Sequence, residues 1–151
     1  MVSPPAPRTL ADLLRGWSDE RLATLLRERP DLVSPTPHDS SQLASRAAVR
    51  SSLLRAMDGL THLELAVLDA LVVVGPCDQG RLEQVVHAAP GATAAALCRL
   101  QDLVLVWAAP DGLRALTGVA DGFAGGVGAS GLRPCTPGAE ADSVAPRLEL
   151  L

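Results

Sequence analysis

The feature that most constrains the fold is a helix-start signal followed at once by an apolar run in the middle of the chain. Thr61 and Glu64 have the T-x-x-E spacing of a capping box, in which each side chain accepts a hydrogen bond from a backbone N–H of the first turn. The run that follows, ELAVLDALVVVG, is apolar on nearly every side of a helix, and Gly75-Pro76 ends it. We therefore predict a helix here that is buried centrally.

Two more helix signals and a hairpin signal follow this helix. Asp78 precedes QGRLEQVVHA, and Thr93 precedes AAALCRLQDL, each in the position of an N-cap. Two short β-type runs, VLVW and LRAL, then flank the turn AAPDG. Three helices and a hairpin in this order, with short turns, predict a winged helix-turn-helix domain over residues 60–120.

The segment before residue 60 is also predicted to be helical. Thr9 and Ser18 are candidate N-caps of two short helices, and QLASRAAVRSSLLRAM is predicted to form a third. The whole chain has no Tyr, one Phe and two Trp, so Ala, Leu and Val must fill the core, which suits close-packed helices better than a sheet. The predicted fold class is mainly α, with an N-terminal helical segment at 9–59 packed on the winged helix.

Both ends of the chain have compositions typical of disorder. Residues 1–8 are rich in proline, and residues 121–151 are rich in Gly, Pro and Ala and show no periodicity. The stretch GVGASG within the second segment matches the dinucleotide pattern G-x-G-x-x-G, but no apolar strand precedes it, and Pro134 and Pro137 forbid the helix that would hold a pyrophosphate. We therefore predict a Gly-rich tail and no cofactor.

Charge and composition exclude several functional classes. The chain has a net charge of −4, and all 13 of its basic residues are Arg. Without Lys there is no Walker phosphate loop, Schiff-base lysine or Ser-Lys dyad. The N-terminus lacks the apolar segment of a signal peptide, and the longest apolar run is far shorter than the roughly 20 residues of a membrane span. We expect a cytoplasmic protein that binds no membrane and no small-molecule substrate.

Two groups of residues that could carry chemistry are better explained by structural roles. Cys77, His87 and Cys98 are spaced too widely for a typical structural zinc site, so we expect no metal. Asp69 lies inside the most apolar helix, where a carboxylate could act as a base, but a structural ion pair is the commoner role.

The predicted ion pair joins the two halves of the chain. Arg46 and Arg50 fall within or beside the apolar stripe of the helix that precedes residue 59. We predict that at least one of them pairs with Asp58 or Asp69, which would tie the N-terminal helices to the winged helix.

Nucleic-acid binding would depend on few cations. In a DNA-binding winged helix the third helix reads bases and the wing contacts phosphates. Arg99 on that helix, Arg114 on the hairpin and Arg81 on the second helix are the candidate contacts. Residues 60–120 carry only these three Arg against six acidic residues. Charge alone therefore favours a winged helix that binds protein or packs on its own neighbouring segment.

The order of several motifs resembles a known family. The stretches LADLLRGWSDERLATLLRERPDLVSPTP, QLASRAAVRSSLLRAMDGLTHLELAVLDAL and LCRLQDLVLVWAAPDGLRAL together resemble the N-terminal region of bacterial XPB-like helicase-associated proteins, over about residues 9–120. The resemblance implies a non-catalytic, DNA-associated accessory module and a helicase or other protein subunit as partner. Residues 121–151 depart from the family's expected continuation, so we expect a fragment, a frameshifted product or a stand-alone N-terminal module, and their unusual composition favours truncation or a frameshift. The alternative is a protein–protein docking module without nucleic-acid contact.

Overall fold

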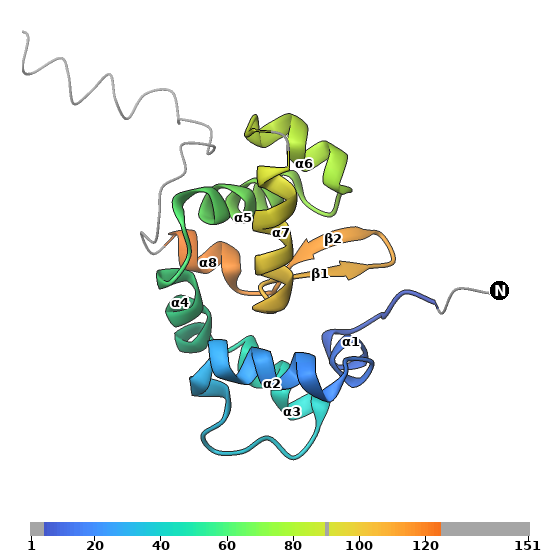
Figure 1. Cartoon of the computed structure of the whole chain (residues 1–151), viewed down its shortest axis with the longest axis vertical. Helices are drawn as coiled ribbons and strands as arrows, with labels where there is room; N and C mark the ends of the chain where they lie inside the picture. The colour runs from blue at the N-terminus through green and yellow to red at the C-terminus, as the bar shows by residue number, and fades with distance from the viewer. Residues whose placement is uncertain (1–4, 90, 125–151) are drawn as a thin grey trace, which may run out of the picture.

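The computed structural model describes residues 5–89 and 91–124, and these residues form a mainly helical protein with one small hairpin (Figure 1). This confirms the predicted fold class at that level. In chain order the described elements are α1 (Leu10–Arg15), α2 (Asp19–Glu28), a 3₁₀ turn η1 (Pro30–Leu32), α3 (Ser40–Ala47), α4 (Arg50–Asp58), α5 (His62–Val74), α6 (Gln79–Val86), α7 (Ala92–Asp102), β1 (Val106–Ala109), β2 (Gly112–Ala115) and α8 (Val119–Ala124). No helix among them is long and apolar enough to span a bilayer.

Most of the predicted helix starts are confirmed by their capping hydrogen bonds. The side chains of Thr9, Ser18 and Asp78 accept hydrogen bonds from backbone N–H groups at the starts of α1, α2 and α6. At α5 both halves of the capping box form: Glu64 N–H donates to Thr61 Oγ1 at 3.2 Å, and Thr61 N–H donates to Glu64 Oε2 at 3.0 Å. Polar capping therefore determines where these helices begin.

One predicted cap is wrong. Thr93 does not cap α7, because Gly91 occupies the N-cap position in the left-handed region, with φ of 81°. Thr93 lies inside the first turn of α7 and is buried. A side chain other than glycine's rarely adopts that backbone conformation, so Gly91 rather than the threonine hydroxyl lets the helix start there.

The central position predicted for α5 is also observed. The helix contacts α6, α7, β2 and α8 (Figure 1). Val67, Leu68 and Leu71 are at most 1% exposed, and they belong to an apolar cluster that extends from Leu14 in α1 to Phe123 in α8. The N-terminal helices therefore share one continuous core with the elements around α5.

The helix predicted over QLASRAAVRSSLLRAM is two helices. α3 ends at Ala47 and α4 begins at Arg50, with Val49 in an extended conformation between them. Ala47 and Leu53 are both buried, so the break lets both helices face the core. It also frees the carbonyl oxygen of Ala47, which accepts a hydrogen bond of 3.0 Å from Arg29. A contact from a distant segment thus satisfies the carbonyl group at the break.

The predicted start of the C-terminal tail needs correction. Residues 121–124, expected to be disordered, belong to α8, because Val119 and Phe123 are buried against the apolar cluster. Helix α8 approaches α4 closely, since a Cβ at Gly122 would lie 3.0 Å from Met57 Sδ. Residues 1–4 and 125–151, with the stretch GVGASG, lie outside the described residues.

The hairpin lies beside α7 (Figure 1) and begins two residues later than the run VLVW predicts. Trp107 pairs with Arg114 and Ala108 pairs with Leu113 in antiparallel register. On its other side Leu113 exchanges two backbone hydrogen bonds with Cys77, of 2.8 and 3.4 Å. β2 is therefore paired on both sides, and β1 forms an edge of this small sheet.

Candidate functional site

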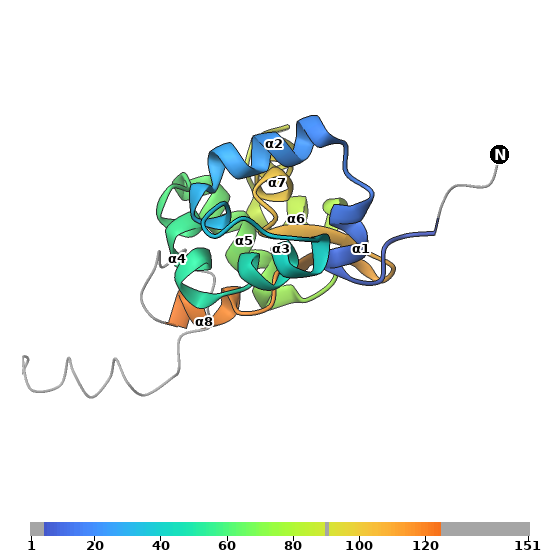
Figure 2. The ribbon, with the colours of Figure 1, turned by 90° about the horizontal axis from the view of Figure 1, so that it is seen from below.

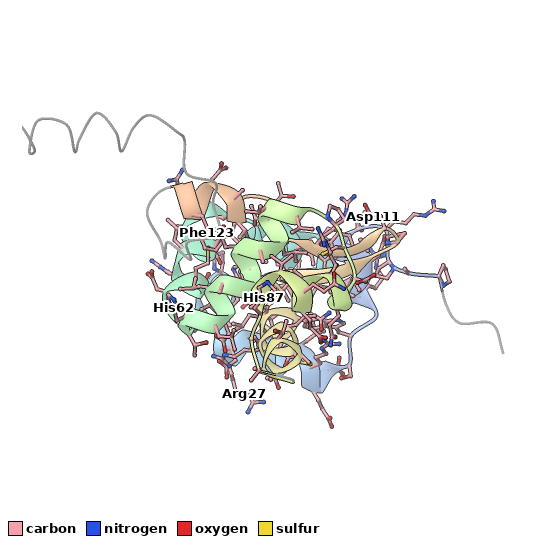
Figure 3. The ribbon with its side chains drawn as sticks, turned by 90° about the horizontal axis from the view of Figure 1, so that it is seen from above. Arg27, His62, His87, Asp111 and Phe123 are labelled. Atoms are coloured by element: carbon pink, nitrogen blue, oxygen red, sulfur yellow. The ribbon has the colours of Figure 1, made fainter. Side chains whose placement is uncertain are left out.

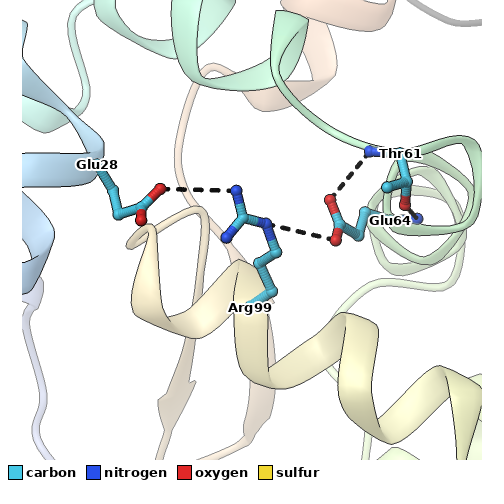
Figure 4. Close-up of polar contacts among 4 residues, drawn as sticks. All are labelled: Glu28, Thr61, Glu64 and Arg99. Atoms are coloured by element: carbon cyan, nitrogen blue, oxygen red, sulfur yellow. Dashed lines mark hydrogen bonds and ion pairs between the residues drawn. The ribbon is translucent and has the colours of Figure 1, made fainter.

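The predicted DNA-contacting residue of α7, Arg99, lies between two carboxylates (Figure 4). Its Nη2 is 3.6 Å from Glu28 Oε2 at the end of α2, and its Nε is 3.5 Å from Glu64 Oε1 at the start of α5. Glu64 is itself held by the Thr61 capping box and is only 7% exposed. Arg99 therefore connects three helices, and its charge is matched by two acids.

Helix α2 lies across the C-terminal half of α7 (Figure 2). Arg21 of α2 is 3.5 Å from Asp102 of α7, and its guanidinium carbon is 3.9 Å from the centre of the Trp17 ring. Together with the Glu28–Arg99 pair, these contacts place α2 over two of the residues on the outward side of α7. Part of the surface that a DNA-reading helix needs is thus covered by the protein's own N-terminal segment.

Arg114, the predicted phosphate contact of the hairpin, is also paired. Its Nε donates to Asp111 Oδ1 at 2.9 Å, and its Nη2 forms a second, shorter contact with Asp111 Oδ2. These hydrogen bonds lower the pKa of the Asp111 carboxyl and raise the pKa of Arg114. The tip of the hairpin, where Asp111 lies in Figure 3, therefore presents a neutral pair.

Arg81 differs from the other two candidates. It is exposed in the first turn of α6, where its backbone N–H donates to the Asp78 cap at 2.8 Å. Its guanidinium makes no ion pair or hydrogen bond with the part of the chain that the structure describes. Of the three predicted contacts, Arg81 is thus the one whose charge stays available to a partner.

The predicted ion pair between the two halves is replaced by a different contact. Within residues 5–89 and 91–124, no ion pair joins Arg46 or Arg50 to Asp58 or Asp69. Arg50 and Asp58 are exposed, and Asp69 is buried in α5. Because α3 and α4 are two separate helices, Arg46 and Arg50 lie in different positions from those they would have in the single helix that was predicted.

Arg29 makes the connection instead. It is 1% exposed, and its Nη1 donates to the carbonyl oxygen of Leu103, just after α7, at 3.1 Å. Its Nη2 donates to Ala47 O at 3.0 Å and to Ser52 Oγ at 2.6 Å, and the Ser52 hydroxyl donates in turn to Asp31. Burial lowers the pKa of Arg29, and the charge of Asp31 opposes that effect.

The position of Arg29 in the helical pattern of α2 indicates from the sequence alone that it is buried. Arg29 follows Leu25 by four positions, so it continues the apolar stripe of α2 instead of facing solvent. Arg27, two positions earlier, points away from the protein in Figure 3. Helical phase therefore distinguishes the buried arginine from its exposed neighbour.

A largely apolar cavity of about 360 Å³ lies between α7 and the hairpin, with Asp78, Gln79 and Gln101 also in its lining. Its walls include Ala94, Leu97 and Cys98 of α7 together with Ala108 and Leu113 of the two strands. Cys98 is exposed, whereas Cys77 is half-buried, and burial raises the pKa of the Cys77 thiol. Within the described residues, no group of three His, Cys, Asp or Glu side chains has the arrangement of a metal site.

Comparison of the chain with protein-family models, with curated proteins and with solved structures finds no match. The resemblance to the XPB-like helicase-associated family therefore stays a prediction that depends on the three stretches quoted above.

Proposed function

We propose that this protein is a non-catalytic docking module: a winged helix, formed by α5, α6, α7 and the hairpin, on which the N-terminal helices are packed. The order of these elements and their short turns support the winged-helix assignment. The isolated bridge between Cys77 and Leu113, on the outer side of β2, is consistent with this assignment. The partner we propose is another protein.

The observation that carries this proposal is the position of Arg99 between Glu28 and Glu64. A helix that enters a DNA groove needs an accessible face and cations whose counterions are released on binding. Here α2 covers part of that face, and Arg99 and Arg114 are both paired with acids of the same chain. Little affinity for phosphate remains, which favours protein over DNA.

The β1 edge at Ala108, which is exposed, supplies a surface for such a partner, whereas Val106 earlier on the same edge is fully buried. Leu116 N–H donates to Leu105 O, and Leu113 bonds outward to Cys77, so Val106 and Ala108 occupy the pairs that are not hydrogen-bonded within the hairpin. Their N–H and C=O groups accordingly point away from β2. An extended segment of a partner protein would pair with this edge and place a side chain in the adjacent apolar cavity.

Two variants, one at the β1 edge and one in the adjacent cavity, test this docking mode together with one control. Ala108→Pro removes an outward N–H without removing a bond between β1 and β2, and Ala94→Glu places a charge in the cavity. Ala23→Glu makes the same change on the exposed side of α2. A partner protein captured with the full chain as bait should bind Ala108→Pro and Ala94→Glu at least about tenfold more weakly than the unmodified chain. It should bind the Ala23→Glu control as it binds the unmodified chain. Equal binding to all three would contradict docking at this edge.

DNA association is the second candidate, and Arg81 is the observation that favours it. Its exposed guanidinium lies in the first turn of α6, free of an ion pair among the described residues. This candidate agrees with the accessory, helicase-associated role that the resemblance to XPB-like proteins implies. It requires a contact through α6 in place of α7.

A DNA titration separates the two candidates. The full chain would be titrated against labelled duplex, forked and single-stranded DNA at low salt, and the salt concentration then raised. A Kd of about 1 μM or tighter that weakens as the salt concentration rises would favour DNA. In that case Arg81→Glu should weaken DNA binding at least about tenfold more than the control Arg27→Glu does. Absence of binding at low salt, where electrostatic attraction is strongest, would leave protein docking.

A further inference from the structure

The cavity between α7 and the hairpin combines apolar walls with one carboxylate. Leu97 of α7 and Leu113 of β2 belong to its apolar part, and Gln79 and Gln101 contribute amide groups. Asp78, which precedes α6, is the charged residue among the described residues that line it. A pocket with apolar walls and an acidic group suits a side chain that is apolar along its stem and positively charged at its tip.

The negative charge of Asp78 is not matched within the described part of the chain. Its Oδ1 accepts a hydrogen bond of 2.8 Å from the backbone N–H of Arg81, but no cationic side chain of that part makes an ion pair with it. The start of α6 adds a partial positive charge of about half a unit, which offsets the carboxylate only in part. Burial raises the pKa of the neighbouring Cys77 thiol, and the charge of Asp78 raises it further by more than the charge of Arg81 lowers it. Beside this end of the cavity the carboxylate therefore outweighs the guanidinium.

A second cavity along the β1 edge carries no unmatched charge. It has a volume of about 200 Å³, both tryptophans of the chain line it, and it shares Gln101 and Ala108 with the first cavity, so the two adjoin. Its charged lining residue, Arg21, lies 3.5 Å from Asp102 and is thus matched. Among the described residues that line the two cavities, the unmatched charge is the carboxylate of Asp78.

Asp78 lies across the hairpin from the β1 edge. Cys77, the residue before it, pairs with Leu113 on the outer side of β2. Both strands therefore lie between Asp78 and a segment that pairs with β1. Neighbouring strands are about 4.8 Å apart, so three spacings, about 14 Å, separate the two backbones. The Asp78 side chain covers part of this distance, and among cationic side chains Arg and Lys have the length for the rest.

We propose that the partner segment at the β1 edge carries an arginine or a lysine whose side chain crosses this cavity, with its apolar stem against Leu97 and Leu113 and its charged head at the carboxylate of Asp78. This inference rests on the docking function proposed above and adds the charge of the partner. Such a pair contributes selectivity more than affinity, because an acidic side chain in the same place meets a like charge.

Two labelled peptides test the charge of the partner segment. Both are ten-residue, fluorescein-labelled peptides in which Thr and Val alternate, and they differ at one central position, Arg in the first and Glu in the second. Fluorescence polarisation with the full chain should show saturable binding of the Arg peptide, about 5- to 30-fold tighter than that of the Glu peptide. Equal binding of the two peptides, tighter binding of the Glu peptide or no saturable binding of either would overturn the proposal.

A matched pair of variants decides whether Asp78 causes the preference. Asp78→Asn removes the charge and keeps a good N-cap for α6, so the preference for the Arg peptide should fall below about twofold. Asp39→Asn makes the same change at the N-cap of α3 and should keep the full preference. Equal effects of the two variants would reduce the preference to general electrostatics and overturn the assignment.

The variant Ala108→Pro separates failure of this inference from failure of the docking function. If docking at the β1 edge is correct and the charge assignment is wrong, Ala108→Pro weakens the binding of both peptides and Asp78→Asn leaves their ratio unchanged. If docking at this edge is itself wrong, Ala108→Pro binds both peptides as the unmodified chain does. The proposal requires that Ala108→Pro weaken both peptides and that Asp78→Asn remove the preference.

Discussion

The Nη1 of Arg29 donates a hydrogen bond of 3.1 Å to the carbonyl oxygen of Leu103, a residue 74 positions further along the chain. The same guanidinium bonds to Ala47 and Ser52, so one side chain joins the end of α2, the break between α3 and α4, and the end of α7. The orientation of α2 on α7, which covers part of the outward side of α7, is therefore anchored at a buried charge.

Replacement of Arg29 should be strongly destabilising. Arg29→Ala leaves the carbonyl oxygens of Leu103 and Ala47 and the Ser52–Asp31 pair without their buried donor, which we expect to lower the free energy of unfolding by about 3 to 5 kcal/mol. Arg29→Lys should recover only part of this loss, because an ammonium cannot present the planar set of donors of a guanidinium. Urea denaturation of both variants measures the effect.

The control for this prediction is Arg27→Ala. Arg27 is exposed and bonds only within α2, so its loss should change the free energy of unfolding by less than about 0.5 kcal/mol. Equal costs at positions 27 and 29 would show that the buried network does not hold α2 in place.

The capping box of α5 should contribute measurably to stability. Thr61→Ala removes the acceptor of the Glu64 N–H and should cost about 1 kcal/mol, whereas Thr61→Ser keeps the hydroxyl and should cost much less. Thermal and urea unfolding of the two variants provide the comparison. Similar losses for Ala and Ser would mean that packing of the threonine methyl group, and not the cap, is responsible.

Gly112 at the hairpin turn should not tolerate a side chain. Its φ is 125°, and a Cβ there would lie 2.9 Å from the backbone oxygen of Cys77. Gly112→Ala should therefore cost about 1 to 3 kcal/mol and weaken the Cys77–Leu113 bridge. Gly80→Ala, within α6, is the matched control and should stabilise the protein by about 0.5 to 1 kcal/mol. Amide exchange at Leu113 reports the state of the bridge.

The hairpin pair between Asp111 and Arg114 should respond to acid. The hydrogen bonds from Arg114 lower the pKa of Asp111 in the folded state, so the pair's contribution is complete above the unfolded pKa of about 3.9 and is lost as pH falls through the lower folded pKa. Arg114→Gln should return the Asp111 pKa to its usual range. Carboxyl chemical shifts followed from pH 6 to pH 2 measure both values, and an unchanged Asp111 pKa in Arg114→Gln would contradict the assignment.

Much of the local structure of this protein could be predicted from its sequence. Thr9, Ser18, Thr61 and Asp78 cap the helices at whose starts they stand, and the apolar run from Glu64 onward is the buried central helix. These features depend on interactions within a few residues and on helical periodicity, which a sequence displays directly. The mainly helical fold class follows from the same patterns.

Only the tertiary structure decided which arginines are buried and which are paired. The sequence favoured Arg46 and Arg50 as the connection between the two halves, but the interruption of the helix at Val49 moved both of them, and Arg29 forms the connection through three acceptors from distant segments. Likewise, Arg99 was predicted to face DNA, but Glu28 of α2 lies beside it. Such contacts depend on the packing angle of α2 across α7, and no local pattern encodes that angle.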